Sequence, residues 1–268
     1  MTADCILVTG GAGYIGSHTA LALLARGWRV VVVDNLVTGV RALIPEAADF
    51  VEADVADMAA MGRVLRDYDC RAVLHFAGSV VVPESVADPL KYYRNNTAAS
   101  RNLLEAVLDA GITRFIFSST AAVYGNPQSL PVDEDAALAP VSPYGMSKLM
   151  TETMLRDTAA ATDLRYIALR YFNVAGADPQ GRSGQSTPEA THLIKAACEA
   201  ICGKRAGISI FGDDYETADG TGVRDYIHVT DLANAHVAAL DYLLAGGASN
   251  VMNCGYGRGY SVRQVLDT

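Results

Sequence analysis

Short hydrophobic runs alternate with longer helical patterns through the first two thirds of the chain. The runs predict strands at 5–9, 30–33, 50–51, 72–76, 115–117 and 166–169. One helix is expected to follow the turn after the first strand and to end at Arg26, and two others are expected over 95–110 and 144–161. Strict alternation of strand and helix implies right-handed crossovers, so the pattern predicts an α/β fold with a doubly wound parallel sheet. Gly27 and Gly111, which follow two of these helices, are typical C-terminal caps.

The pattern changes after Asn173, where residues 177–184 are polar, contain Gly and Pro, and show no periodicity. A helix over 191–201, a strand at 208–210 and a loop over 213–222 predict a smaller lobe above the carboxyl ends of the strands, where open sheets bind ligands. We therefore expect a main domain over 1–176 and a substrate lobe over 177–268, with about 223–245 returning to the main domain. Ser261 is a good N-cap for a helix that reaches only Thr268, so we expect a truncated chain.

Composition narrows the class of protein. Half of the 268 residues are hydrophobic and 19% are charged, as in an ordered globular chain. The net charge of -9 argues against a nucleic-acid platform, which needs a basic face. The five scattered cysteines are expected to be reduced, and neither they nor the histidines form a metal-ligand pattern, so no metal is expected. We find no signal run and no bilayer-spanning stretch, and expect a cytoplasmic protein.

A glycine-rich turn follows the first predicted strand and opens a helix. In the sequence TGGAGYIG at 9–16, Gly10 permits a tight turn, Gly13 lets a pyrophosphate approach the backbone, and Gly16 allows close packing of helix and strand. Asp34 ends the second strand near the spacing at which a carboxylate binds the ribose 2′-hydroxyl and repels a 2′-phosphate. The pattern predicts a Rossmann-type domain and favours NAD over NADP as its cofactor. Asp54 is either a contact to the adenine edge or a simple loop carboxylate.

A second group of residues is suited to proton transfer. Tyr144 and Lys148 are four apart on one predicted helix face, and Ser142-Pro143 marks the start of that helix. A neighbouring ammonium and a cationic nicotinamide both favour the phenolate of Tyr144, which makes it a candidate general base for hydride transfer at a carbinol carbon. Thr120, after the fifth strand, can hydrogen-bond the reacting oxygen and relay its proton.

These residues resemble the extended short-chain dehydrogenases and, within them, the UDP-galactose (UDP-glucose) 4-epimerase family. The similarity runs through nearly the whole chain: VTGGAGYIGSH at 8–18, DNL at 34–36, HFAG at 75–78, ESV with PLKYYRNN at 84–96, FIFSSTAAVYG at 115–125, SPYGMSKLM at 142–150, LRYFNVAGA at 169–177 and DGTGVRDYIHV at 219–229. The resemblance implies NAD contacts from Tyr14, Ile15, Asp34, Asn35, Asp54, Val55, Phe76, Ala77, Gly78, Asn95, Lys148 and Phe172. It implies contacts to UDP-galactose or UDP-glucose from Thr120, Tyr144, Asn173, Phe211 and Arg224, with Arg224 on the diphosphate unless it is a buried structural arginine.

The resemblance further implies transient oxidation at C4 of the sugar by a resident NAD, and a homodimer formed through a helix bundle, with 100–108 and 150–160 as candidate helices. Thr120 stands where many relatives carry Ser, and Ser79-Val80 where some carry a Lys. A 4,6-dehydratase or a decarboxylase is disfavoured because Ala121-Ala122 replace the acidic residues those enzymes need. Net dehydrogenation with exchangeable NAD stays open, as does a catalytically silent NAD-sensing protein. Acceptance of N-acetylated sugars, the activity of a chain ending at Thr268 and the pathway also stay open.

Overall fold

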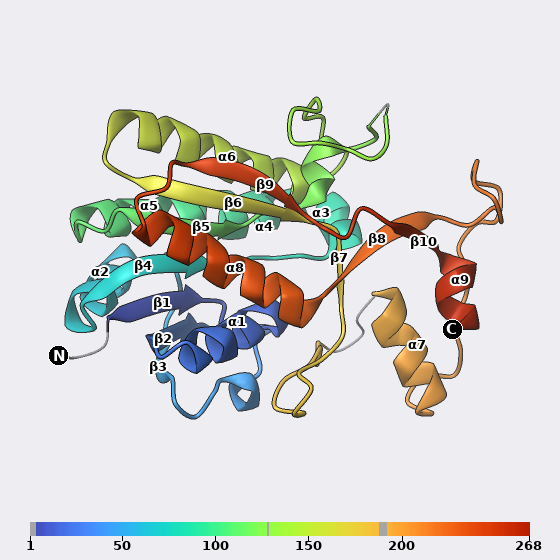
Figure 1. Ribbon diagram of the computed structural model, residues 1–268, viewed down its shortest axis with the longest axis horizontal. Coiled ribbons are helices and arrows are strands. Elements are labelled where there is room, and N and C mark those ends of the chain that lie inside the picture. Colours follow the sequence, from blue (N-terminus) through green and yellow to red (C-terminus); the bar gives the residue numbers. More distant parts are fainter. Residues whose placement is uncertain (1–3, 128, 188–191) are drawn as a thin grey trace.

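The computed structural model describes residues 4–127, 129–187 and 192–268 (Figure 1). Its centre is a sheet of parallel strands in the order β3-β2-β1-β4-β5-β6-β9. The strands are β1 (Cys5–Thr9), β2 (Arg29–Asp34), β3 (Asp49–Glu52), β4 (Cys70–His75), β5 (Arg114–Ser118), β6 (Arg165–Tyr171) and β9 (Asn250–Cys254). The predicted doubly wound parallel sheet of Rossmann type is confirmed.

Helices bury both faces of this sheet. On one face α1 (Tyr14–Ala25) and α8 (Val229–Leu244) pack against each other, and on the other lie α2 (Met58–Asp67), α5 (Ala99–Asp109) and α6 (Pro143–Ala161). Successive strand residues point to opposite faces, so in β1 Leu7 enters the core under α2, α5 and α6, while Val8 enters the core under α1 and α8. This two-sided burial explains why the strands are almost continuously hydrophobic.

A smaller lobe stands beyond the carboxyl ends of the main strands, at the right of Figure 1. The chain leaves β6 through Phe172 into β7 (Asn173–Ala175), which pairs with β8 (Val223–His228), and β8 pairs with β10 (Gly259–Ser261). Two helices, α7 (Leu193–Ile201) and α9 (Val262–Asp267), complete the lobe. After β8 the chain returns to the main layer as α8, and β9 then extends the sheet beside β6.

The structure differs from the predicted elements in three places. The predicted helix over 95–110 is a π-helical turn, η2 (Tyr93–Ala98), followed by α5. The predicted strand at 208–210 is wrong, because these residues form no ladder and Ile210 stays 40% exposed. The helix predicted from Thr191 begins at Leu193 in the structure, and Thr191 itself lies outside the described residues.

Local signals at element ends are confirmed. Gly27 and Gly111 have φ of +84° and +72°, the left-handed conformation typical of a residue that follows a helix. The side chain of Ser261 accepts a hydrogen bond from the Gln264 amide, and Gln264 bonds back to the Ser261 amide, so α9 begins with a capping box.

The remaining short helices are α3 (Val82–Ala87), α4 (Pro89–Tyr92), η1 (Arg41–Leu43) and η3 (Ala121–Tyr124). Over the described ranges, none of the helices has the length and apolar character needed to cross a bilayer.

Candidate active site

The turn between β1 and α1 brings bare backbone to the carboxyl edge of the sheet. Gly10 has φ of +69°, and a Cβ there would lie 2.6 Å from the Ala77 amide nitrogen. A Cβ on Gly16 would lie 2.3 Å from the Gly10 carbonyl oxygen. Gly13 is the N-cap of α1, where no side chain caps the helix and no acidic residue occupies its first turn. The amide end of α1 is therefore suited to an anion such as a pyrophosphate.

Asp34 is held rigidly at the end of β2. It is 8% exposed, and its carboxylate accepts hydrogen bonds from the amides of Ala12 at 3.0 Å and Leu36 at 2.9 Å. Beside it, Asn35 donates to Asp54 at 3.1 Å, so these two polar side chains form one rim of the same edge. Val55 is buried directly after Asp54.

The segment after β4 lies next to the glycine turn. Phe76 packs its ring against His236 of α8 with ring centroids 4.7 Å apart. A Cβ on Gly78 would lie 3.8 Å from Nζ of Lys148, so this backbone also adjoins the predicted catalytic lysine. Asn95 reaches the same segment, donating to the Ser79 hydroxyl at 3.1 Å.

Tyr14 connects the glycine-rich turn between β1 and α1 to the segment that enters the small lobe. Its hydroxyl donates to the Gly176 carbonyl at 2.6 Å, and burial raises its pKa. Ile15 packs on the core under α1. The ring of Phe172 lies next to Gly255, where a Cβ would approach it to 3.0 Å. The predicted cofactor residues thus come from seven separate segments that meet along one edge.

The predicted Tyr and Lys lie in the first turns of α6. Ser142 caps this helix by accepting a hydrogen bond from the Gly145 amide at 3.2 Å, and Pro143 occupies its first position, as predicted. Tyr144 is half-buried and packs edge-on against Tyr92 with ring centroids 6.4 Å apart. Lys148 is only 2% exposed.

The tripeptide 118–120 at the end of β5 is fixed from several sides. Lys148 donates from Nζ to the Ser118 carbonyl at 2.9 Å and lies 5.0 Å from the centre of the Phe117 ring. The Ser118 hydroxyl hydrogen-bonds Tyr171, and the Ser119 amide donates to the Leu169 carbonyl at 2.9 Å. Thr120, next in the chain, accepts a hydrogen bond from the Ala122 amide at 3.1 Å as the N-cap of η3.

Burial acts in opposite directions on the two titrating groups of α6. It raises the pKa of Tyr144, an effect opposed by a hydrogen bond with Thr120, because the phenolate is costly in a buried site. It lowers the pKa of Lys148 to about 8, because the ammonium is costly there, and the negative charge of Glu152 opposes that shift. The structure therefore combines a hydroxyl from Thr120, a phenol and a buried amine at one strand end.

A buried ion pair that the sequence did not indicate lies behind these groups. Glu152 of α6 and Arg170 of β6 are 5% and 4% exposed and approach to 2.6 Å. The Ser119 hydroxyl donates to Glu152, and Arg170 also donates to the Tyr124 hydroxyl at 2.9 Å. The pair therefore holds the backbone next to Thr120.

Asn96, beside the predicted Asn95, was also missed and is almost fully buried. Its side chain accepts from the Ser79 amide at 2.7 Å and donates to the Ser147 hydroxyl at 2.9 Å, so it ties the segment after β4 to α6. The Asn-Asn doublet in the sequence was the only available signal for it.

The predicted substrate residues come from the small lobe and its entrance. Asn173 of β7 donates to the Asp225 carbonyl at 3.4 Å. Arg224 of β8 is exposed, which removes the alternative of a buried structural arginine, and Phe211 is 86% exposed. Over the residues that the structure describes, no group of three or more His, Cys, Asp or Glu is placed to hold a metal ion.

Comparison with known proteins identifies similar chains along almost the whole length. The NAD dependent epimerase/dehydratase family model matches residues 6–255. A UDP-glucose 4-epimerase from Azospirillum brasilense is 61% identical over 263 residues, covering 98% of this chain and 76% of the relative. A UDP-glucose 4-epimerase from Rhizobium meliloti (strain 1021) is 49% identical over 262 residues, covering 98% and 80%.

Solved structures agree. The crystal structure of UDP-glucose 4-epimerase from Brucella ovis in complex with NAD has 48% identity and a TM-score of 0.96, covering 99% of this chain and 81% of that one. Family model, relatives and fold coincide over the turn, the strand ends and the helix that form the candidate site. The chain therefore belongs to the NAD dependent epimerase/dehydratase family.

Proposed function

We propose that this protein interconverts UDP-galactose and UDP-glucose by inverting C4 of the sugar, with NAD as a resident cofactor. The observation that carries the proposal is the assembly of Thr120, Tyr144 and Lys148 at the carboxyl end of β5, with alanines and no acid following Thr120. A relative that is 61% identical to this chain is named UDP-glucose 4-epimerase. We base the choice of substrate on that name.

The edge of the sheet fits NAD. A Cβ on Gly10 or Gly16 would fill the turn at the uncapped start of α1, where a pyrophosphate could bind, and the ordered carboxylate of Asp34 is suited to a ribose hydroxyl. We propose that the cofactor is held by Gly10, Gly13, Tyr14, Ile15, Gly16, Asp34, Asn35, Asp54, Val55, Phe76, Ala77, Gly78, Asn95, Lys148 and Phe172. When bound, NAD would supply reversible hydride acceptance at C4 of the sugar.

The chain's own residues handle the proton. Tyr144 removes the proton of the 4-hydroxyl, and Thr120 hydrogen-bonds the same oxygen and helps to relay that proton. Because burial raises the pKa of Tyr144, its phenolate needs a neighbouring cation, and Lys148 supplies one from the next turn of α6. The same phenol later returns the proton to the 4-keto sugar, so Tyr144 acts first as the general base and then as the general acid.

The absence of an acid beside Thr120 favours epimerisation over elimination. Ala121 and Ala122 form the first turn of η3, so no carboxylate follows Thr120 to remove water from C5 and C6. The 4-keto sugar must instead turn over within the site while its UDP stays bound. We propose Asn173, Phe211 and Arg224 as the residues that hold UDP, which places most of the binding energy on the nucleotide.

Product analysis tests the proposal. The purified protein is incubated with UDP-galactose and NAD, and UDP-glucose is measured by chromatography or NMR in both directions of the reaction. We expect interconversion without a stoichiometric change at the nicotinamide absorption band. Stoichiometric reduction would instead show net dehydrogenation, and NAD binding without any turnover would show an NAD-sensing protein.

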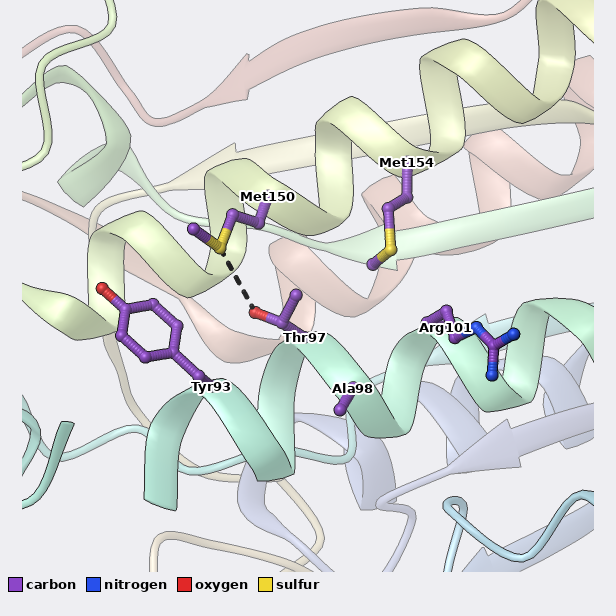
Figure 2. Close-up of a pocket in the computed structure, with 6 residues that line it drawn as sticks. All are labelled: Tyr93, Thr97, Ala98, Arg101, Met150 and Met154. Atoms are coloured by element: carbon purple, nitrogen blue, oxygen red, sulfur yellow. Dashed lines mark hydrogen bonds between the residues drawn. The ribbon is translucent and has the colours of Figure 1, made fainter. Parts of the chain in front are cut away.

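We further propose that the protein is a homodimer assembled through η2, α5 and α6. Figure 2 shows a groove between these helices, where Met150 and Met154 of α6 face Thr97 and Ala98 of η2. Tyr93 and Arg101 complete its lining. A groove formed by two neighbouring helices can receive the same pair from a second copy about a two-fold axis, which gives the helix bundle that the family resemblance implies.

Replacing Ala98 with Arg is expected to convert the dimer to a monomer. The exposed Ala98 lines the groove, and an arginine there would bring two like charges together across a two-fold interface. Light scattering after size-exclusion chromatography measures the mass. The matched control is Ala47→Arg, an exposed position outside the groove, and a dimer that survives both changes would place the interface elsewhere.

A further inference from the structure

One face of the small sheet β7-β8-β10 gathers polar and aromatic side chains. Tyr226 of β8 is in register with Asn173 of β7, and Arg224 is in register with Tyr260 of β10. Residues in register, and residues two apart on one strand, project to the same side of a sheet. Asn173, Tyr226, Arg224 and Tyr260 therefore share one face, which includes two of the residues proposed to hold UDP.

Arg258 adds a second guanidinium to this face. It lies two residues before Tyr260, and its Cζ is 5.0 Å from the centre of the Tyr260 ring. Tyr260 is thus the neighbour of Arg224 across the ladder and the stacking partner of Arg258. Stacking covers one side of the guanidinium plane and leaves the N–H donors at its edge free to bind an anion.

The turn that carries Arg258 is tied to β8. The Asp225 carboxylate accepts hydrogen bonds from the amides of Tyr256 at 3.2 Å and Gly257 at 2.8 Å, and Gly257 has φ of +69°. The Tyr256 hydroxyl in turn bonds Asp231 at the start of α8. Arg258 therefore projects from a fixed turn and not from a loose loop.

Neither guanidinium on this face has its charge compensated. In the parts of the chain that the structure describes, Arg224 and Arg258 form no ion pair, although the chain carries a net charge of -9. Both residues are exposed. Arg224 donates to the Val223 carbonyl at 2.7 Å, and Arg258 lies over the Tyr260 ring, so neither contact supplies a negative charge. Two guanidinium groups without a counter-charge on one face match a ligand that bears two adjacent negative charges.

We propose that Arg258, stacked on Tyr260, binds the diphosphate of the nucleotide sugar together with Arg224. The identity of the ligand rests on the function proposed above. Arg258 is then a determinant of nucleotide affinity, outside the residues that handle the proton. Because a planar fork binds phosphate oxygens through paired N–H donors, lysine should replace it only in part.

Binding of UDP to the wild-type protein and to three variants tests this inference. Isothermal titration with UDP is performed on wild type, Arg258→Ala, Arg258→Lys and Arg263→Ala at ionic strengths of about 0.01 M and about 1 M, where the screening lengths are about 30 Å and 3 Å. Arg263 is an exposed arginine of α9 outside this face, so its loss changes the net charge equally. Retained NAD and an unchanged melting temperature show that each variant is folded.

At low ionic strength we expect Arg258→Ala to weaken UDP binding about tenfold, Arg258→Lys to weaken it less, and Arg263→Ala to bind as wild type. The difference between Arg258→Ala and wild type should shrink at high ionic strength, because the lost contact is ionic. Equal UDP affinity of Arg258→Ala and wild type would overturn the inference. A loss of affinity that is the same at both ionic strengths would also overturn it, since the contact would then not be to the diphosphate. If wild type itself does not bind UDP, the proposed function fails first.

Discussion

Replacing Tyr144 with Phe is expected to lower the turnover of UDP-galactose by about 10²- to 10⁴-fold while NAD stays bound. The substitution removes only the hydroxyl, so the aromatic packing against Tyr92 and the start of α6 remain. Without that oxygen residue 144 can no longer take the proton of the 4-hydroxyl. Steady-state rates and the NAD content of the purified variant measure the two parts of this expectation.

Tyr166→Phe is the matched control. Tyr166 is a buried tyrosine at the amino-terminal end of β6, opposite the edge that carries the site, so the same loss of a hydroxyl should leave turnover near wild type. Turnover by Tyr144→Phe at the wild-type rate would remove Tyr144 from the mechanism.

Replacing Glu152 with Gln is expected to lower the free energy of unfolding by about 3–5 kcal/mol. The change leaves the guanidinium of Arg170 buried without its counter-charge, and it also weakens the acceptor for the Ser119 hydroxyl. Denaturation in urea, followed by circular dichroism, measures the loss. Turnover should fall in the folded fraction as well, because the backbone next to Thr120 loses one of its anchors.

Asp157→Asn provides the comparison within the same helix. Asp157 pairs with Arg156, and both side chains are more than 60% exposed, so we expect a loss below about 1 kcal/mol. If the two variants are destabilised equally, the buried pair has no special role. The double variant Glu152→Met with Arg170→Met should regain much of the lost stability, since it removes both charges together.

Most of the main sheet was predictable because the signals of its strands and helices are local. Hydrophobic runs such as 30–33 are buried on both faces, and glycine marks the ends of helices at Gly27 and Gly111. The strand at 208–210 was predicted from β-prone residues alone, but a strand also needs a hydrogen-bonded neighbour, and among the described residues no strand pairs with this segment. Conversely β9 was not predicted, because its sequence NVMNC contains two asparagines and none of its residues is fully buried.

In the candidate site, the residues that are close in sequence could be predicted, and the contacts between distant segments could not. Tyr144 and Lys148 lie four apart on one helix, so their proximity follows from the helical repeat. The pair of Glu152 and Arg170 joins a helix to a strand, and each residue alone resembles a solvated charge. The stacking of Arg258 on Tyr260 beside Arg224 likewise depends on a ladder that only the fold creates.

The central claim is that the hydride at C4 is removed and returned within one site. UDP-galactose labelled with deuterium at C4 tests it most directly, in ordinary water, with the UDP-glucose formed analysed by mass spectrometry and NMR. We predict that the deuterium is retained at C4 of the product, because the hydride never meets solvent. Loss of the deuterium to water, or its recovery in released reduced cofactor, would contradict the account.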